Sequence, residues 1–215
     1  MQSDVCGYGL GGFISSTAVA FTFSRASREE PNASFPLAVG VVAACTVMIL
    51  RVLIATAVLR PTLALALIPY ALAPFLVGTV IIVVGLRRGE EKAAVQPPSN
   101  PLQVFSALQM AALFQIVLFA VHAVRSYWGD VGLLWSGAVL GFTDVDALTI
   151  SMAKSAEGLI PIAVAAKAIM IGILSNTVLK GLLGLTLGRA RFRRLAPAWL
   201  TVIAIATAVS IAALH

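Results

Sequence analysis

The sequence predicts an all-α, polytopic integral membrane protein, and three observations lead to that fold class. Hydrophobic residues make up 60% of the 215 residues, charged residues make up 11%, and the mean hydropathy is +0.98. Soluble domains contain about a quarter charged residues. Apolar runs of about 20 residues recur, and each is long enough to cross a bilayer about 30 Å thick. The runs are continuous rather than alternating, which favours spanning helices over a transmembrane barrel.

Seven apolar elements are expected along the chain. They lie at 9–24, 36–59, 63–86, 102–126, 131–153, 160–187 and 195–214. A charged, proline-rich linker at 88–101 separates the first three elements from the last four. The first and fifth elements are unusually polar at their centres, with the sequences GGFISSTAVAFTFS and GFTDVDALTIS. We expect these two elements to be broken or re-entrant helices, interrupted near 11–17 and 141–146, rather than simple lipid-facing spans.

An internal repeat relates the two parts of the chain. The first and fifth elements align without a gap, the following helices align at a nearly constant offset, and the last helices do the same. The matched pairs include Gly12 with Gly141, Phe13 with Phe142, Arg51 with Asn176 and Pro69 with Pro197. The sequence therefore predicts a first repeat at 1–87 and a second at 102–215 within one membrane domain. The helix at 102–126 has no counterpart, so we expect the first repeat to lack an upstream helix.

The basic residues indicate the topology. If the fifth element crosses the membrane, they divide equally between the two faces. If it enters and returns on one side, nine basic residues share one face and three share the other, which agrees with the positive-inside rule. The linker at 88–101 and the loop at 188–194 are then both cytoplasmic. The two repeats have opposite orientations, and inverted repeats with broken helices near the membrane midplane are typical of transporters.

Asp144 and Asp146 are the strongest candidates for a functional site. A carboxylate at membrane depth costs about 2.5–3.5 kcal/mol, and such residues usually face a cavity or a partner. Both can face one site only if the backbone is unwound, which Gly141 and Thr143 would permit. Oxygen atoms of Thr143 and Thr149 could then join the two aspartates around a hard cation. The alternative is that one aspartate caps a half-helix while the other pairs with a basic residue.

Other polar residues in apolar segments are secondary candidates. Ser15, Ser16 and Thr17 occupy the equivalent place in the first repeat, where they either complete an ion shell or serve as small residues in helix packing. Asn176 either lines the same cavity or bonds helix to helix. Arg51 and Lys180 are expected to be charge partners of the acidic residues, because an unpaired charge in hydrocarbon is expensive. For Arg51 the alternative partner is the polar cluster at Asn176.

Four sequence blocks resemble a known family: GGFISSTAVAF, MILRVLIATAVL, GFTDVDALTISMA and SNTVLKGLL. Together they resemble the uncharacterised transmembrane domain found C-terminal to the MgtC/SapB domain in bacterial membrane proteins. The resemblance covers nearly the whole chain and implies a multi-pass protein of the bacterial inner membrane, connected with magnesium or other ion homeostasis. The MgtC part itself is absent from this sequence, so its activities do not carry over.

These observations predict a small ion transporter, or half of one, with a cation or proton site at the membrane midplane. The alternative is a non-transporting regulatory or assembly module that binds another membrane protein. We expect no enzymatic activity and no cofactor, with Mg²⁺ or another hard cation as substrate. The expected partners are the lipid bilayer, an MgtC-type domain or other membrane protein, and a second copy of the chain. The net charge of +6 does not indicate nucleic acid, because the basic residues lie in short loops.

Overall fold

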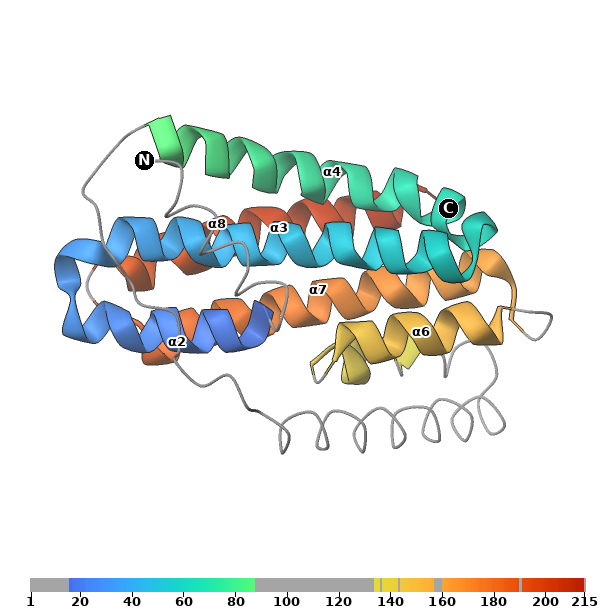
Figure 1. Ribbon diagram of the computed structural model, residues 1–215, viewed down its shortest axis with the longest axis horizontal. Helices are drawn as coiled ribbons and strands as arrows, with labels where there is room; N and C mark the ends of the chain where they lie inside the picture. Colours follow the sequence, from blue (N-terminus) through green and yellow to red (C-terminus); the bar gives the residue numbers. More distant parts are fainter. Residues whose placement is uncertain are drawn as a thin grey trace. The chain divides into compact units, whose positions relative to one another are not determined.

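The computed structural model describes residues 16–87, 134–135, 137–142, 144–156, 160–189 and 191–214. All regular secondary structure in these ranges is helical, which confirms the all-α prediction (Figure 1). The predicted helix at 102–126, the linker at 88–101, Ser15 and Thr143 lie outside the described residues, as do 11–15, where the first helix was predicted to be interrupted.

The described helices follow the predicted apolar elements closely. They are α2 (Ser16–Glu29), the 3₁₀ turn η1 (Pro31–Ala33), α3 (Ser34–Leu59), α4 (Pro61–Arg87), α6 (Val145–Ser155), α7 (Ile162–Leu187) and α8 (Phe192–Ala213). Among them, α3, α4, α7 and α8 are long and apolar enough to cross a membrane. The protein is therefore a multi-pass membrane protein whose apolar helices contact the lipid bilayer.

Helix α2 extends further than the sequence suggests. The predicted element ended at residue 24, but the helix continues to Glu29 and carries Arg25 and Arg28 on its last turns. The hydroxyl of Ser24 donates to the carbonyl of Ala20 at 2.6 Å, which lets this polar side chain stay buried within the helix. Pro31 follows the helix closely, and a proline disfavours helical backbone in the residue before it.

The chain forms two compact units. Unit 1 contains Met1–Arg51, Pro69–Val95 and Thr177–His215, and unit 2 contains Val52–Ile68 and Gln96–Asn176. These units are defined by contacts in space, whereas the predicted repeats are defined by sequence matches. The repeat boundaries at 87 and 102 therefore stay a prediction.

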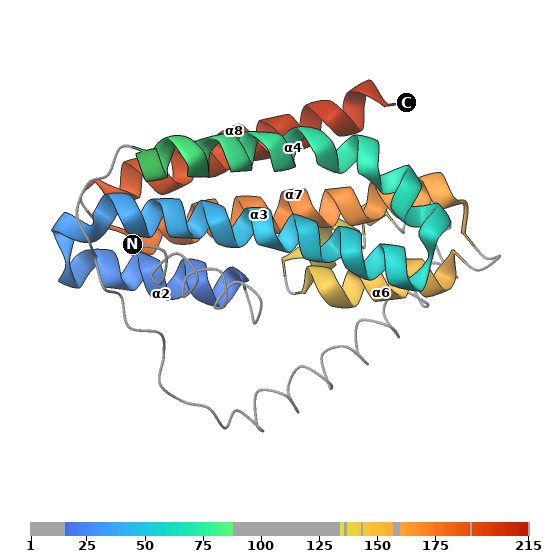
Figure 2. The ribbon, with the colours of Figure 1, turned by 45° about the horizontal axis from the view of Figure 1, so that its top comes forward.

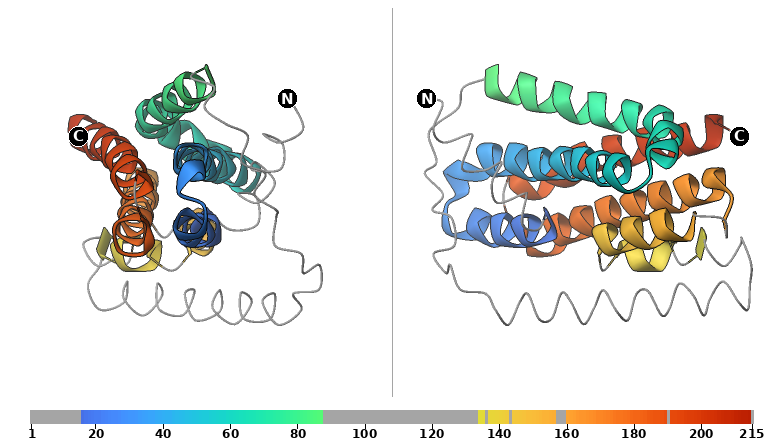
Figure 3. Two further views of the ribbon diagram at one scale, coloured as in Figure 1. Left: turned by 90° about the vertical axis from the view of Figure 1, so that its left-hand side faces the viewer. Right: turned by 45° about the vertical axis from the view of Figure 1, so that its right-hand side comes forward.

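In unit 1, α2 and α3 form a helical hairpin (Figure 3). Gly40 of α3 leaves room for the ring of Phe23, and Gly85 of α4 leaves room for the side chain of Val39. Helices α4 and α8 lie side by side (Figure 2), joined by a hydrogen bond of 2.8 Å from the Ser210 hydroxyl to the Tyr70 carbonyl. Small residues thus let the helices of unit 1 approach closely, as is common in membranes.

In unit 2, the segment 137–141 packs backbone to backbone against α7. A Cβ atom on Gly137 would lie 2.5 Å from the carbonyl oxygen of Ala168, and one on Gly141 would overlap the backbone of Gly172. Gly172 in turn leaves room for the side chain of Leu148 on α6. Both the segment 137–141 and α6 are therefore held against the same stretch of α7.

Candidate functional site at a helix break

The fifth apolar element is interrupted where the sequence predicts an interruption. Residues 137–141 are helical, Asp144 is extended with φ −154° and ψ 108°, and α6 begins at Val145. Helix α6 has 11 residues, which corresponds to a length of about 16 Å at 1.5 Å per residue. That is about half the thickness of a bilayer core. The predicted break near 141–146 is confirmed.

The second half of the broken element begins with an aspartate cap. One carboxylate oxygen of Asp144, Oδ1, accepts hydrogen bonds from the backbone N–H of Asp146 at 2.8 Å and of Ala147 at 3.3 Å. An N-cap side chain satisfies donors that have no partner within the helix, and its negative charge is stabilised by the helix dipole. Asp144 therefore fills the capping role that the sequence offered as the alternative to a cation ligand.

The first half of the broken element is held by a side chain from another helix. Nδ2 of Asn176, on α7, donates to the carbonyl oxygen of Gly141 at 2.9 Å. Asn176 is buried, and Gly141 is the last helical residue before the break. The sequence left two roles open for Asn176, and this bond corresponds to the second of them, a hydrogen bond between helices. It also brings Asn176 to the same break as Asp144.

Gly141 contributes to the break through packing. The sequence suggested that this glycine permits the backbone to unwind, but its φ does not lie in the left-handed region. A side chain at this position would meet the carbonyl oxygen and Cα of Gly172. Gly141 is therefore required because two backbones touch here, and the extended residue that precedes α6 is Asp144, three positions later.

The remaining predicted ligands in unit 2 lie on α6. Asp146 is half-buried in the first turn, and Thr149 is fully buried. The Thr149 hydroxyl donates to the carbonyl of Val145 at 2.7 Å, which leaves its oxygen lone pairs as acceptors. Within the described ranges, no three His, Cys, Asp or Glu side chains come together as a metal site. A hard cation here would need backbone, hydroxyl or water oxygens beside the two carboxylates.

The candidates of the first repeat belong to unit 1. Ser16 is buried and Thr17 is half-buried at the start of α2, whereas Asp144 and Asp146 belong to unit 2. A shared ion shell for the two groups stays a prediction. The same holds for Arg51, which is half-buried on α3 and was expected to pair with an acidic residue or with Asn176.

Lys180 lies in a polar cluster that the sequence did not indicate. It is 1% exposed, and its Nζ lies 3.2 Å from Sδ of Met48 on α3. One turn away, the thiol of Cys45 lies 3.5 Å from the hydroxyl of Thr177. The i, i+3 spacing of Cys45 and Met48 could have suggested a shared helix face, but not its match to α7. Pairing of Lys180 with an aspartate stays a prediction.

Comparisons with known proteins place the chain in a family. A family model described as "Domain of unknown function (DUF4010)" matches residues 9–188. The chain belongs to this family. An "Uncharacterized protein" of Aquifex aeolicus (strain VF5) is 27% identical over 176 residues, which are 80% of this chain and 76% of the relative. No solved structure matches the chain. The family description names no activity and no MgtC/SapB domain, so that association is a proposal only.

Proposed function

We propose that this protein is a small ion transporter, or one half of one, with its cation or proton site at the helix break before α6. The observation that carries the proposal is the interruption itself, which places the half-buried Asp146 beside the capping Asp144 in a multi-pass membrane protein. Discontinuous helices supply ion and substrate sites in many transporters. Acidic residues at membrane depth commonly mark ion or proton pathways.

The two aspartates have different roles in this proposal. Asp144 holds the broken backbone by capping α6 through Oδ1, and in this proposal its second carboxylate oxygen is the ion ligand. Asp146 supplies the second carboxylate from the first turn of the same helix. Carboxylates beside a discontinuous helix commonly mark cation or proton pathways, so the proposed transported species is a cation or a proton. Mg²⁺ is the cation that the family resemblance suggests as substrate, and no cofactor is needed.

The test is ion flux in proteoliposomes that contain the full chain. Asp146→Asn should abolish cation-dependent or proton-dependent flux while leaving the folded helix content unchanged. Asp144→Asn removes the charge but keeps a good N-cap, so it should also reduce flux without unfolding α6. Glu30→Gln is the matched control, because it neutralises an exposed carboxylate of unit 1. Flux that is equal in all four proteins would refute the site.

A second candidate function is a regulatory or assembly module without transport. Protein groups already bond both sides of the break, Asp144 to the α6 backbone and Asn176 to Gly141, as a purely structural break requires. In this case the chain would bind an MgtC-type domain or another membrane protein of the bacterial inner membrane, and would act through a homo-oligomer. Cross-linking in bacterial membranes, with no flux in proteoliposomes, is the result that favours this candidate.

A further inference from the structure

The turn between α7 and α8 carries a dense positive charge at the membrane surface. Helix α7 ends at Leu187 and α8 begins at Phe192, and both are long enough to span. A turn between two spans lies at the level of the lipid headgroups. The segment contains four exposed arginines: Arg189, Arg191, Arg193 and Arg194. In the described part of unit 1, the acidic side chains are Glu29 and Glu30 alone.

The backbone that presents these arginines is held by α2 and by a buried ring. The backbone N–H of Arg189 donates to the Ser27 hydroxyl at 3.1 Å. Arg28 donates to the carbonyl oxygens of Leu187 and Thr186, at 2.5 and 3.2 Å, and thereby caps the end of α7. Phe192 is completely buried at the start of α8. The backbone at Arg189 and the start of α8 are therefore held in place, which reduces the reorganisation needed for the arginines there to bind an anion.

Two aromatic rings stand beside this arginine platform, residues 189–194. The guanidinium of Arg191 lies over the ring of Phe35, 5.5 Å from its centroid. Trp199 packs edge-on against the same ring, with centroids 5.7 Å apart. Aromatic residues gather at the boundary between headgroups and hydrocarbon. Phe35 is buried and Trp199 is half-buried, so an occupant of this surface would meet the basic platform, the exposed part of Trp199 and the adjacent apolar face of α8.

We propose that the arginine platform at 189–194, with Phe35 and Trp199 beside it, binds the phosphate headgroup of an anionic phospholipid. Such a lipid offers an anion at headgroup depth and acyl chains that continue along α8, whose Val202, Ile205 and Val209 are exposed. The N-terminus of α8 carries a partial positive charge, which is unfavourable beside the arginines there. An anion bound at this end is therefore attracted by the arginines and by the helix dipole. Each arginine near an anionic surface strengthens binding by roughly fivefold at low salt.

The test uses the full chain with Trp128→Phe and Trp135→Phe, so that Trp199 is the fluorophore. The protein is reconstituted in phosphatidylcholine vesicles containing brominated phosphatidylglycerol, and separately in vesicles in which the phosphatidylcholine is brominated. We expect stronger quenching of Trp199 by the brominated phosphatidylglycerol at equal bromine content, weakening as salt is raised. Equal quenching by the two brominated lipids would overturn the proposal.

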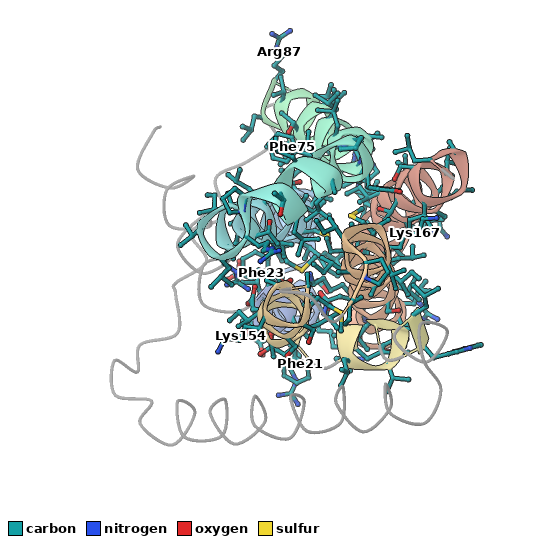
Figure 4. The ribbon with its side chains drawn as sticks, turned by 90° about the vertical axis from the view of Figure 1, so that its right-hand side faces the viewer. Phe21, Phe23, Phe75, Arg87, Lys154 and Lys167 are labelled. Atoms are coloured by element: carbon teal, nitrogen blue, oxygen red, sulfur yellow. The ribbon has the colours of Figure 1, made fainter. Side chains whose placement is uncertain are left out.

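Paired variants separate this site from general surface charge. Arg193→Gln with Arg194→Gln should lower the preference for phosphatidylglycerol by about fivefold per arginine, or roughly 25-fold together. Arg25→Gln with Arg87→Gln removes two exposed arginines from α2 and α4, and Arg87 extends away from the end of its helix (Figure 4). This control pair should leave the preference unchanged. An equal loss in both pairs, or loss of the preference on adding millimolar inorganic phosphate, contradicts a lipid site on the platform.

Discussion

Replacement of Ser210 by alanine should reveal how unit 1 tolerates a proline inside a spanning helix. Pro74 lies within α4 and has no N–H, so it cannot donate the usual helical bond to the carbonyl of Tyr70, four residues earlier. The hydroxyl of Ser210 on α8 donates to that carbonyl at 2.8 Å and replaces the missing donor. The hydroxyl of Tyr70 also donates to the carbonyl of Leu214 at 2.8 Å. The side chain and the backbone carbonyl of Tyr70 therefore both connect α4 to the C-terminal part of the chain at α8.

The expected loss of unfolding free energy for Ser210→Ala is about 1 kcal/mol. A buried carbonyl left without a donor costs roughly 1–3 kcal/mol, and interhelical hydrogen bonds in membranes contribute about 0.6 kcal/mol on average. The Ser210 hydroxyl also lies 2.9 Å from the carbonyl of Thr207 on its own helix. Because one hydrogen is shared between two acceptors, the lower part of the range applies.

A double-mutant cycle with Pro74→Ala tests the reasoning directly. Alanine at position 74 returns the N–H that the Tyr70 carbonyl lacks, so Ser210→Ala should then cost only a few tenths of a kcal/mol. Thr207→Val is the control, because that buried hydroxyl bonds to the carbonyl of Ile203 within α8. The assay is reversible unfolding in mixed micelles followed by circular dichroism. An equal cost of Ser210→Ala in both backgrounds would refute the compensation.

Three further predictions follow from the helix break and the charge distribution. Asp144→Ala should lower the unfolding free energy by about 1 kcal/mol, and Asp144→Asn should cost much less, since asparagine also caps helices; the same unfolding assay measures both. Gly141→Ala should destabilise unit 2 by about 1–3 kcal/mol through overpacking, whereas Gly181→Ala, with open space around it, should be close to neutral or stabilising. Cysteines introduced at Ala93 and Ala190 should both react with impermeant thiol reagents from the cytoplasmic side, and labelling from opposite sides would exclude a re-entrant fifth element.

Local sequence was sufficient to predict the break but not how it is stabilised. The Gly-Phe-Thr-Asp-Val-Asp run is polar within an apolar element, and an aspartate before a helix is a strong capping residue, so the interruption near 141–146 could be expected. The bond from Asn176 to the Gly141 carbonyl joins residues 35 positions apart. It depends on how far α7 is rotated, and the sequence gives no measure of that rotation.

For the charged residues too, local sequence indicated burial but not the residues that they contact. Lys180 was recognisable as a buried charge from its place in an apolar run, and the structure confirms its burial. Its contact with Met48 spans 132 residues and was not foreseen, because an aspartate looks like a better partner than a thioether when only residue types are compared. The extension of α2 to Glu29 was also missed, since charged residues after an apolar run resemble a loop.

The sequence by itself determined that this chain crosses the membrane several times, where α3, α4, α7 and α8 lie, and that one element is broken at an aspartate. These features depend on hydropathy and on interactions between groups a few residues apart, and both can be assessed from short stretches of sequence. The tertiary structure alone decided which residues meet across helices, such as Ser210 with Tyr70 and Gly141 with Gly172. In an apolar helix nearly every face is equally hydrophobic, so the choice of contacting face depends on close packing and on the few polar groups that need partners.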